Sequence, residues 1–198
     1  MTRVTADLGI SLDGFAAGPD QSMDHPLGVG GLHLLDDWMF DAAEENAAEV
    51  EAIVARSAFI MGRNMFGPPE GGDWDDAWRG WWGEDPPYHA PVFVLTHHER
   101  DDLPMDGGTT FHFVTDGIEA ALDRAREAAG DGEVGIMGGA ETTRQYLAAG
   151  LIDELRLHMV PLVLGSGERL LEDLAGLRLE PVSARHTSKV THLTYRRA

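Results

Sequence analysis

Hydrophobic and polar positions follow two different periods along this chain, and these periods predict its elements. Apolar and polar residues alternate over residues 3–12, which is typical of a strand with one buried face. Compact apolar runs predict a short strand at residues 57–62 and buried strands at residues 91–96 and 134–137, and we expect another strand at residues 110–114. Apolar residues three and four apart predict helices at residues 36–56, 116–129 and 140–149. Asp116 and Glu119 form a capping-box pattern at the start of the second helix, and Gly150 suits a helix C-cap.

The pattern changes near the end of the chain. Residues 151–164 and 190–196 alternate again, with Glu154, Arg156 and His158 opposite the leucines of the first stretch, and both suit antiparallel strands. Pro161 indicates that the first of them bends or lies at an edge there. The whole pattern predicts an α/β fold in one domain, residues 1–198. Its central sheet is mostly parallel and flanked by helices, with antiparallel C-terminal strands.

Composition narrows the class of protein. Apolar residues make up 43% and charged residues 25% of the 198 residues, as in ordinary globular proteins. The absence of cysteine excludes disulfides, thiolate metal sites and cysteine nucleophiles. No stretch has the roughly 20 apolar residues of a membrane helix and the N-terminus has no signal-peptide pattern, so we expect a cytoplasmic protein without a membrane partner.

The charge argues against one class of partner. A net charge of −19 repels phosphate backbones, so we do not expect nucleic-acid binding. A small anionic ligand remains compatible, because a few local cations and helix N-termini can override the mean field.

Two loops look unusual in the sequence. Residues 18–31 are rich in glycine and proline, but their glycine cluster is not a dinucleotide fingerprint, because no apolar strand precedes it. Residues 68–91 hold four tryptophans among acidic residues, glycines and prolines. This segment suits a lid over a flat ligand, a patch for a partner chain or a cover for the core, and we favour the cover.

Residues 133–150 carry the clearest chemical signal. A buried strand ends in Gly138 and Gly139, and a helix begins directly afterwards with Thr142 and Thr143 in its first turn. Free N–H groups and the helix dipole make such a turn suitable for an anion. A plain β–α turn that uses glycine for tight packing is the alternative.

Two other strand ends carry polar residues. Arg63 follows the strand at residues 57–62, and Thr96 and His97 end the strand at residues 91–96. The adjacent histidines His97 and His98 lack metal-ligand spacing, so we expect no metal site. A surface arginine and solvated loop histidines are the alternatives. Ligands of parallel sheets bind beyond the carboxyl ends of the strands, so these ends together predict a crevice for an anionic, nucleotide-like ligand.

These stretches also carry a family resemblance. The chain resembles dihydrofolate reductase, and more closely the reductase domain at the C-terminus of the bifunctional riboflavin-biosynthesis deaminase-reductase, especially its stand-alone bacterial relatives. The matching stretches are Ser11-Leu12-Asp13-Gly14, Met61-Gly62-Arg63, Leu95-Thr96-His97, Ile136-Met137-Gly138-Gly139, residues 150–155, residues 161–165 and Thr191-His192-Leu193. They are spread over nearly the whole chain.

The resemblance implies a dihydrofolate reductase-like fold with NADPH as hydride donor. Gly138, Gly139 and the helix start, Ala140, Glu141 and Thr142, would hold the pyrophosphate, and the two glycines would often be joined by a cis peptide. Arg63, Asn64, Thr96 and His97 would lie near the adenosine 2′-phosphate. Asp13 and Phe15 would border the nicotinamide, and Trp38 would line the substrate side. A homodimer through the C-terminal strands is implied as well.

Some positions depart from these families. Met65 stands where dihydrofolate reductases often have threonine, and Met137 stands where the riboflavin reductases tend to have glutamate. Asp36, Asp37 and Asp41 are candidates for a substrate-binding carboxylate. Cofactor use is therefore better supported than either named substrate.

The sequence leads to an NADPH-dependent reductase as its main hypothesis. Hydride would pass to a C=N or C=O carbon of a pterin-like heterocycle or a ribosylaminopyrimidine, with water or Asp13 as the proton donor. Two alternatives remain open. One is a phosphate-handling hydrolase or transferase, although its common motifs are missing. The other is a non-catalytic nucleotide-binding or sensor protein on the same fold.

Overall fold

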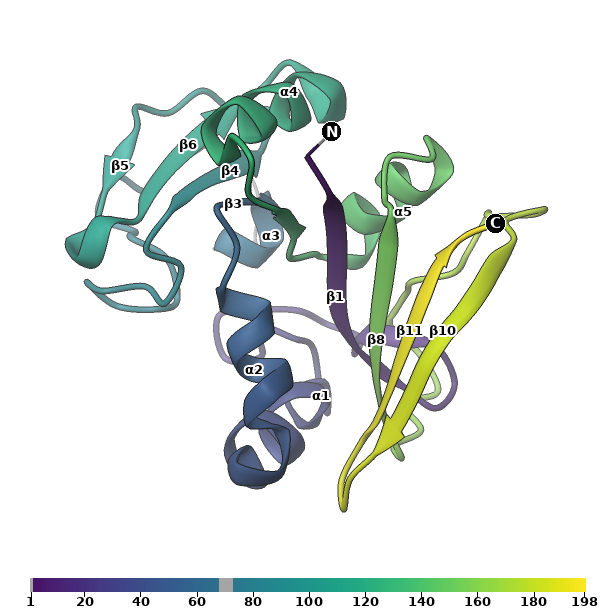
Figure 1. Cartoon of the computed structure of the whole chain (residues 1–198). Helices are drawn as coiled ribbons and strands as arrows, with labels where there is room; N and C mark the ends of the chain where they lie inside the picture. The colour runs from purple at the N-terminus through teal and green to yellow at the C-terminus, as the bar shows by residue number, and fades with distance from the viewer. Residues whose placement is uncertain (1, 68–72) are drawn as a thin grey trace.

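The chain folds around one large mixed sheet (Figure 1). The computed structural model describes residues 2–67 and 73–198. Within them the strand order is β10-β11-β8-β1-β7-β3-β4-β6-β5, and β2 and β9 form a small separate ribbon. The strands are β1 (Val4–Ser11), β2 (Phe15–Ala17), β3 (Ala58–Gly62), β4 (Pro91–Leu95), β5 (Leu103–Pro104), β6 (Thr110–Val114), β7 (Val134–Ile136), β8 (Glu154–Val160), β9 (Glu168–Arg169), β10 (Leu179–His186) and β11 (Thr191–Arg197).

Strand direction divides the sheet into a parallel centre and antiparallel edges. The run from β8 through β1, β7, β3 and β4 to β6 is parallel throughout. The strands β10 and β11 join β8 in antiparallel pairing, and β5 does the same beside β6. This arrangement confirms the predicted fold class. The apolar run of β3 explains its central place, because all five of its residues are buried.

Helices and loops cover both faces of the sheet. The helical segments are α1 (His33–Leu35), a π-helical turn (Asp36–Phe40), a 3₁₀ turn (Ala43–Asn46), α2 (Ala47–Val54), α3 (Arg63–Phe66), a second 3₁₀ turn (Asp106–Gly108), α4 (Gly117–Ala129) and α5 (Ala140–Ala148). On one face, α4 and α5 pack on Ala6, Leu8 and Ile60. On the other face, α2 and Trp38 cover Val160 at the end of β8, while the tryptophan-rich segment covers β3, β4 and β6.

The tryptophans therefore pack on the sheet, as the favoured interpretation predicted. Trp74, Trp78 and Trp82 pack against the aromatic cluster around Phe66 and Phe111. Residues 68–72, at the start of this predicted loop, lie outside the described part of the chain.

The helix predicted at residues 36–56 is wrong as one continuous element. It is broken into the π-helical turn, the 3₁₀ turn and α2. The buried side chain of Asn46 explains one break, because its Nδ2 donates to the carbonyl oxygens of Trp38 at 3.0 Å and Ala42 at 2.8 Å. A side-chain amide thus binds backbone carbonyls at the junction between the turns.

Other local predictions also need correction. Asp116 precedes α4, but its side chain makes no capping hydrogen bond. Glu154 and His158 were predicted opposite the buried leucines, yet both are buried, because β8 is an inner strand with both faces covered. The strand β10 was not predicted. Seven of its eight residues are exposed, so it lacks the apolar pattern of a strand.

Candidate active site

Three neighbouring strand ends meet at one edge of the sheet. The strands β7, β3 and β4 lie side by side in parallel, so Gly138, Arg63 and Thr96 come together beyond their carboxyl ends. The Gly62 N–H donates to the Gly138 carbonyl at 2.7 Å, which joins the first two of these ends. The predicted crevice residues are therefore neighbours in space, although they are far apart in sequence.

The helix α5 approaches β3 very closely at this edge. A Cβ atom on Gly62 would lie 2.3 Å from Thr142 Oγ1, which is well inside van der Waals contact. With threonine at position 142, a side chain at position 62 would therefore clash with the first turn of α5. This contact fixes where the helix N-terminus points.

The glycine pair shapes the start of α5. Gly138 has φ +108°, a value that L side chains rarely adopt, and the Gly138–Gly139 peptide is cis, as the resemblance implied. The N–H of Thr143 already donates to Gly139 O, whereas those of Ala140, Glu141 and Thr142 come before this first helical bond. The space beside Gly139 is open, because a Cβ atom added to this residue would meet no heavy atom within 4 Å. This turn fits a pyrophosphate.

Glu141 is exposed in the same turn. Its carboxylate binds Arg144 and accepts a hydrogen bond from Gln145 at 3.0 Å, and both contacts hold its pKa below the usual range. The negative charge next to the anion site is therefore partly neutralised within the helix.

Arg63 is the most unusual charged residue at this edge. All three of its guanidinium nitrogens are shielded from water, and none has a hydrogen-bond acceptor among the described residues. The indole of Trp74 lies over the guanidinium, with Cζ 3.9 Å from the ring centroid. Desolvation lowers the pKa of Arg63, although the field of Asp73 opposes this. A buried cation without acceptors is costly unless a ligand supplies them.

The remaining predicted cofactor residues differ in exposure. Thr96 is buried, and its Oγ1 accepts a hydrogen bond from the His98 N–H at 3.1 Å, so it shapes the turn after β4. His97 and Asn64 are exposed next to this edge.

Asp13 lies in a different part of the molecule. Ala6 pairs with Ile136 at the end of β7, while β1 continues for five more residues to Ser11, roughly 16 Å further along the strand. The Asp13 carboxylate accepts hydrogen bonds from Ser11 Oγ at 2.7 Å and from the N–H groups of Leu164 at 3.1 Å and Gly165 at 2.7 Å. These bonds, with that of Ser11 the strongest, lower its pKa to about 2. Asp13 is therefore ionised at neutral pH and ties the turn after β1 to residues 164–165.

Phe15 and Trp38 are both buried. Arg169 stacks over the Phe15 ring with Cζ at 4.2 Å. Trp38 is fully buried, and its Nε1 donates to Leu34 O at 2.8 Å. Its ring lies 4.5 Å from that of His158. Met137, directly before the glycine pair, packs against the hydrophobic cluster that contains Trp38.

Sequence reasoning missed a buried polar group beneath Trp38. His158 and His192 meet through their Nδ1 atoms at 2.8 Å, and Asn46 Oδ1 lies 2.9 Å from His192 Nε2. Because these residues come from β8, β11 and the 3₁₀ turn, their contact follows only from the tertiary arrangement. The alternation of apolar and polar residues in β8 and β11 was the available signal for these histidines. It predicted that His158 lies on the exposed face of β8, so the contact was not expected.

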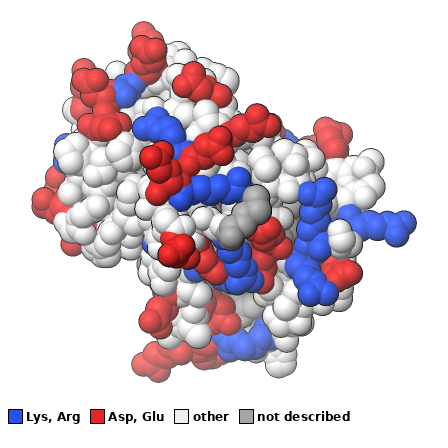
Figure 2. Space-filling model, turned by 45° about the horizontal axis from the view of Figure 1, so that its top comes forward, with Lys and Arg blue, Asp and Glu red and all other residues white. Residues whose placement is uncertain are grey.

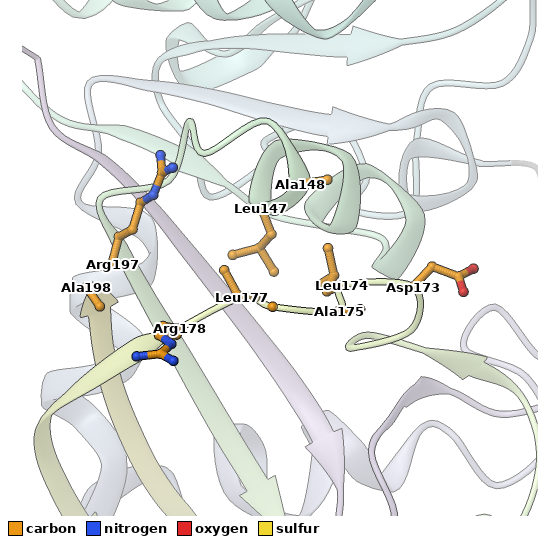
Figure 3. Close-up of a pocket in the computed structure, with 10 residues that line it drawn as sticks. Leu147, Ala148, Asp173, Leu174, Ala175, Leu177, Arg178, Arg197 and Ala198 are labelled. Atoms are coloured by element: carbon orange, nitrogen blue, oxygen red, sulfur yellow. The ribbon is translucent and has the colours of Figure 1, made fainter.

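A separate cavity of about 540 Å³ lies at the other end of α5 (Figure 3). It is lined by Leu147, Ala148, residues 173–178, Arg197 and Ala198. The C-terminal end of a helix carries partial negative charge, so this cavity suits an anion less well than the glycine edge does. Arg197 Nη1 already donates to Gly150 O at 2.7 Å.

Comparisons with known proteins agree with this geometry. The chain has the dihydrofolate reductase-like fold: dihydrofolate reductase from Enterococcus faecalis, solved with NADP(H), matches 98% of this chain and 96% of its own with a TM-score of 0.57 at 15% identity. The chain belongs to the RibD C-terminal domain family, whose model matches residues 2–193.

Two other relatives match over nearly their full length. A candidate riboflavin biosynthesis protein from Shewanella sp. PV-4 has a TM-score of 0.62 at 23% identity, covering 100% of this chain and 99% of its own. The protein YyaP of Bacillus subtilis (strain 168) is 24% identical over 203 residues, covering 98% of this chain and 94% of its own. At these identities the structural matches establish the fold alone.

Within residues 2–67 and 73–198, no helix is long and apolar enough to cross a membrane. The same residues contain no group of three or more His, Asp or Glu side chains that could hold a metal ion. Figure 2 shows acidic side chains spread over one face, with basic side chains between them.

Proposed function

We propose that this protein is an NADPH-dependent reductase that binds its cofactor across the ends of β7, β3 and β4. The single observation that carries the proposal is Arg63, whose three guanidinium nitrogens are buried without an acceptor among the described residues. It stands one strand away from a helix N-terminus preceded by two glycines. A dinucleotide that carries a 2′-phosphate needs a cation for that phosphate and such a turn for its pyrophosphate. The chain's family is one of reductase domains that typically use NADPH.

Each group has a separate task in this proposal. The N–H groups of Ala140, Glu141 and Thr142 bind the pyrophosphate, and Arg63 binds the 2′-phosphate with Asn64, Thr96 and His97 around it. When bound, NADPH supplies the hydride, and the protein orients it against a flat acceptor. The proposed acceptor is a pterin-like heterocycle or a ribosylaminopyrimidine, reduced at a C=N or C=O bond. The Asp13 carboxylate is ionised and already accepts hydrogen bonds from two backbone N–H groups. Water is therefore the proposed proton source, and Asp13 has a positioning role.

The direct test is binding of NADPH and NADH, measured by calorimetry on the wild type, Arg63→Ala and Gly139→Val. We expect wild type to prefer NADPH. Arg63→Ala should lose that preference while NADH binding persists, because NADH has no 2′-phosphate. Gly139→Val should weaken both dinucleotides, because a branched side chain enters the space before α5. Equal loss of both dinucleotides in Arg63→Ala would contradict the assignment of Arg63.

Turnover separates catalysis from binding alone. NADPH oxidation is followed at 340 nm with a panel of pterins and ribosylated pyrimidines. Steady oxidation with one of them supports a reductase. Tight NADPH binding without oxidation across the panel would favour the alternative function, a non-catalytic nucleotide-binding or sensor protein.

We also propose a homodimer that forms through the C-terminal strands. The support is β10, an edge strand whose residues are nearly all exposed, including Val182 at 53%. Apolar exposure on an edge strand favours association. Light scattering should give twice the chain mass for wild type and a lower mass for Val182→Glu. A monomeric wild type would contradict the proposal.

A further inference from the structure

A second arginine lies beside the same indole. Arg100 follows β4 by five residues, and its Cζ lies 5.1 Å from the ring centroid of Trp74, 5.1 Å from that of Phe113 and 5.6 Å from that of Phe66. Its Nη2 donates to Trp78 O at 2.6 Å, whereas Nη1 is buried with no acceptor among the described residues. Arg100 therefore uses Nη2 within the fold and has Nη1 without an acceptor among the described residues.

Trp74 connects Arg100 with Arg63. The same ring lies 3.9 Å from Arg63 Cζ and 5.1 Å from Arg100 Cζ, and its Nε1 donates to His98 O at 2.9 Å. This hydrogen bond fixes the indole to the turn after β4. The guanidinium groups of Arg63, which follows β3, and Arg100, which follows β4, both lie close to the ring. Stacking on aromatic rings orients a guanidinium without using its hydrogen-bond donors.

Neither arginine is neutralised by a carboxylate in the described structure. No ion pair within 4.0 Å joins Arg63 or Arg100 to an acidic residue there, although the chain holds 34 Asp and Glu residues. The carboxylates of Asp73, Asp75 and Asp76 act on them only through the field. Burial lowers the pKa of Arg100, and the positive charges of Arg79 and then Arg63 lower it further. Two like charges in an aromatic pocket are costly, and one shared anion would offset that cost.

We propose that Arg63 and Arg100, whose guanidinium groups both contact the indole of Trp74, bind one phosphomonoester dianion between them. Under the proposed function, on which this assignment rests, the dianion is the 2′-phosphate of NADPH, and Arg100 is a second residue that selects NADPH over NADH. A sugar phosphate on the substrate carries the same chemistry, so the test includes both sources.

Calorimetric titrations with 2′,5′-ADP, NADPH, NADH and ribose 5-phosphate test the proposal on the full chain. The variants are Arg100→Ala, Arg100→Lys and, as a matched control, Arg79→Ala. Arg79 lies in the same segment, but it is half exposed and already bound to Glu84 at 3.2 Å. Loss of one charged hydrogen-bonding partner should weaken 2′,5′-ADP and NADPH by about 10-fold to 100-fold in Arg100→Ala. Arg100→Lys should fall between this variant and wild type, and NADH affinity should stay within about twofold in all of them.

Other results separate this proposal from the proposed function. If wild type binds 2′,5′-ADP or ribose 5-phosphate in an Arg100-dependent way but neither dinucleotide, the phosphate site stands and the reductase assignment fails. If NADPH binds and Arg100→Ala leaves its affinity unchanged, the cofactor site stands and the role of Arg100 is overturned. Equal weakening of NADPH and NADH would overturn it as well, because it would show that Arg100 only supports the local fold. If none of the four compounds binds to the wild type, the proposed phosphate site is overturned as well.

Discussion

The Nδ1 atoms of His158 and His192 lie 2.8 Å apart inside the protein, and the surrounding bonds decide which of them donates. Asn46 Nδ2 donates to two carbonyl oxygens, so Asn46 Oδ1 must accept the proton of His192 Nε2. A neutral His192 then has a bare Nδ1, and His158 Nδ1 is the donor between the rings. His158 Nε2 lies 3.7 Å from Asp7 Oδ1, too far for a hydrogen bond.

This arrangement predicts a loss of stability in mild acid. Burial, followed by the charge of His158, lowers the pKa of His192 to about 4, below its ordinary value of 6.5. The unfolded chain therefore binds a proton near pH 6.5, whereas the folded protein does not until about pH 4. The free energy of unfolding should fall as the pH drops through this window, by at most about 1.4 kcal/mol per pH unit. Urea unfolding at several pH values measures the slope.

A matched pair of variants isolates the contribution of His192. His192→Asn should reduce the slope, while His186→Asn, at the exposed end of β10, should leave it unchanged. Equal slopes in wild type and His192→Asn would contradict the assignment.

Asn46 is expected to be a major stabilising residue. Asn46→Ala leaves two backbone carbonyls and His192 Nε2 without their partner, and it should lower the free energy of unfolding by about 3 kcal/mol. Asn64→Ala changes an exposed amide and should alter it by less than about 0.5 kcal/mol. Similar effects of the two substitutions, measured by urea unfolding, would show that the buried amide is not essential.

Gly62 should tolerate alanine only when Thr142 is changed as well. The added Cβ would lie 2.3 Å from Thr142 Oγ1 but 3.5 Å from its Cβ. Gly62→Ala should therefore cost about 1–3 kcal/mol, and the double variant Gly62→Ala, Thr142→Ala should recover most of this loss. Gly139→Ala serves as a control for stability, since nothing lies within 4 Å of its added Cβ. Failure of the double variant to recover stability in thermal unfolding would mean that the close approach is not limiting.

Asp13 should affect structure rather than proton transfer. With a pKa of about 2 in the folded protein, below its usual 3.8, it contributes stability that is present above pH 4 and lost as the pH falls toward 2. Asp13→Asn should therefore leave the pH profile of turnover unchanged between pH 5 and 9. It should speed hydrogen exchange at the Leu164 and Gly165 amides, which lose a charged acceptor. An inflection that disappears from the pH profile would instead restore Asp13 as a proton donor.

Elements that depend on residues close along the chain follow from the sequence, and elements that depend on distant contacts do not. The apolar runs of β3 and β4 predicted strands of the sheet correctly, because strands that are covered on both faces commonly read as near-continuous apolar runs. The strand β10 escaped prediction because its residues are exposed and backbone pairing with β11 holds it in the sheet. The break in the helix between residues 36 and 56 was not predicted either, because the Asn46 side chain donates hydrogen bonds to carbonyl oxygens four and eight residues away.

The sequence by itself determined the strand–helix order, the glycine pair before α5 and the residues at three strand ends, because each depends on neighbours along the chain. Only the tertiary structure decided that these ends are adjacent, that Arg63 and Arg100 contact the same indole of Trp74, and that His158 meets His192 in the interior. Strand order and side-chain packing set these contacts. Their energies depend on burial and on distances between residues that no local pattern encodes.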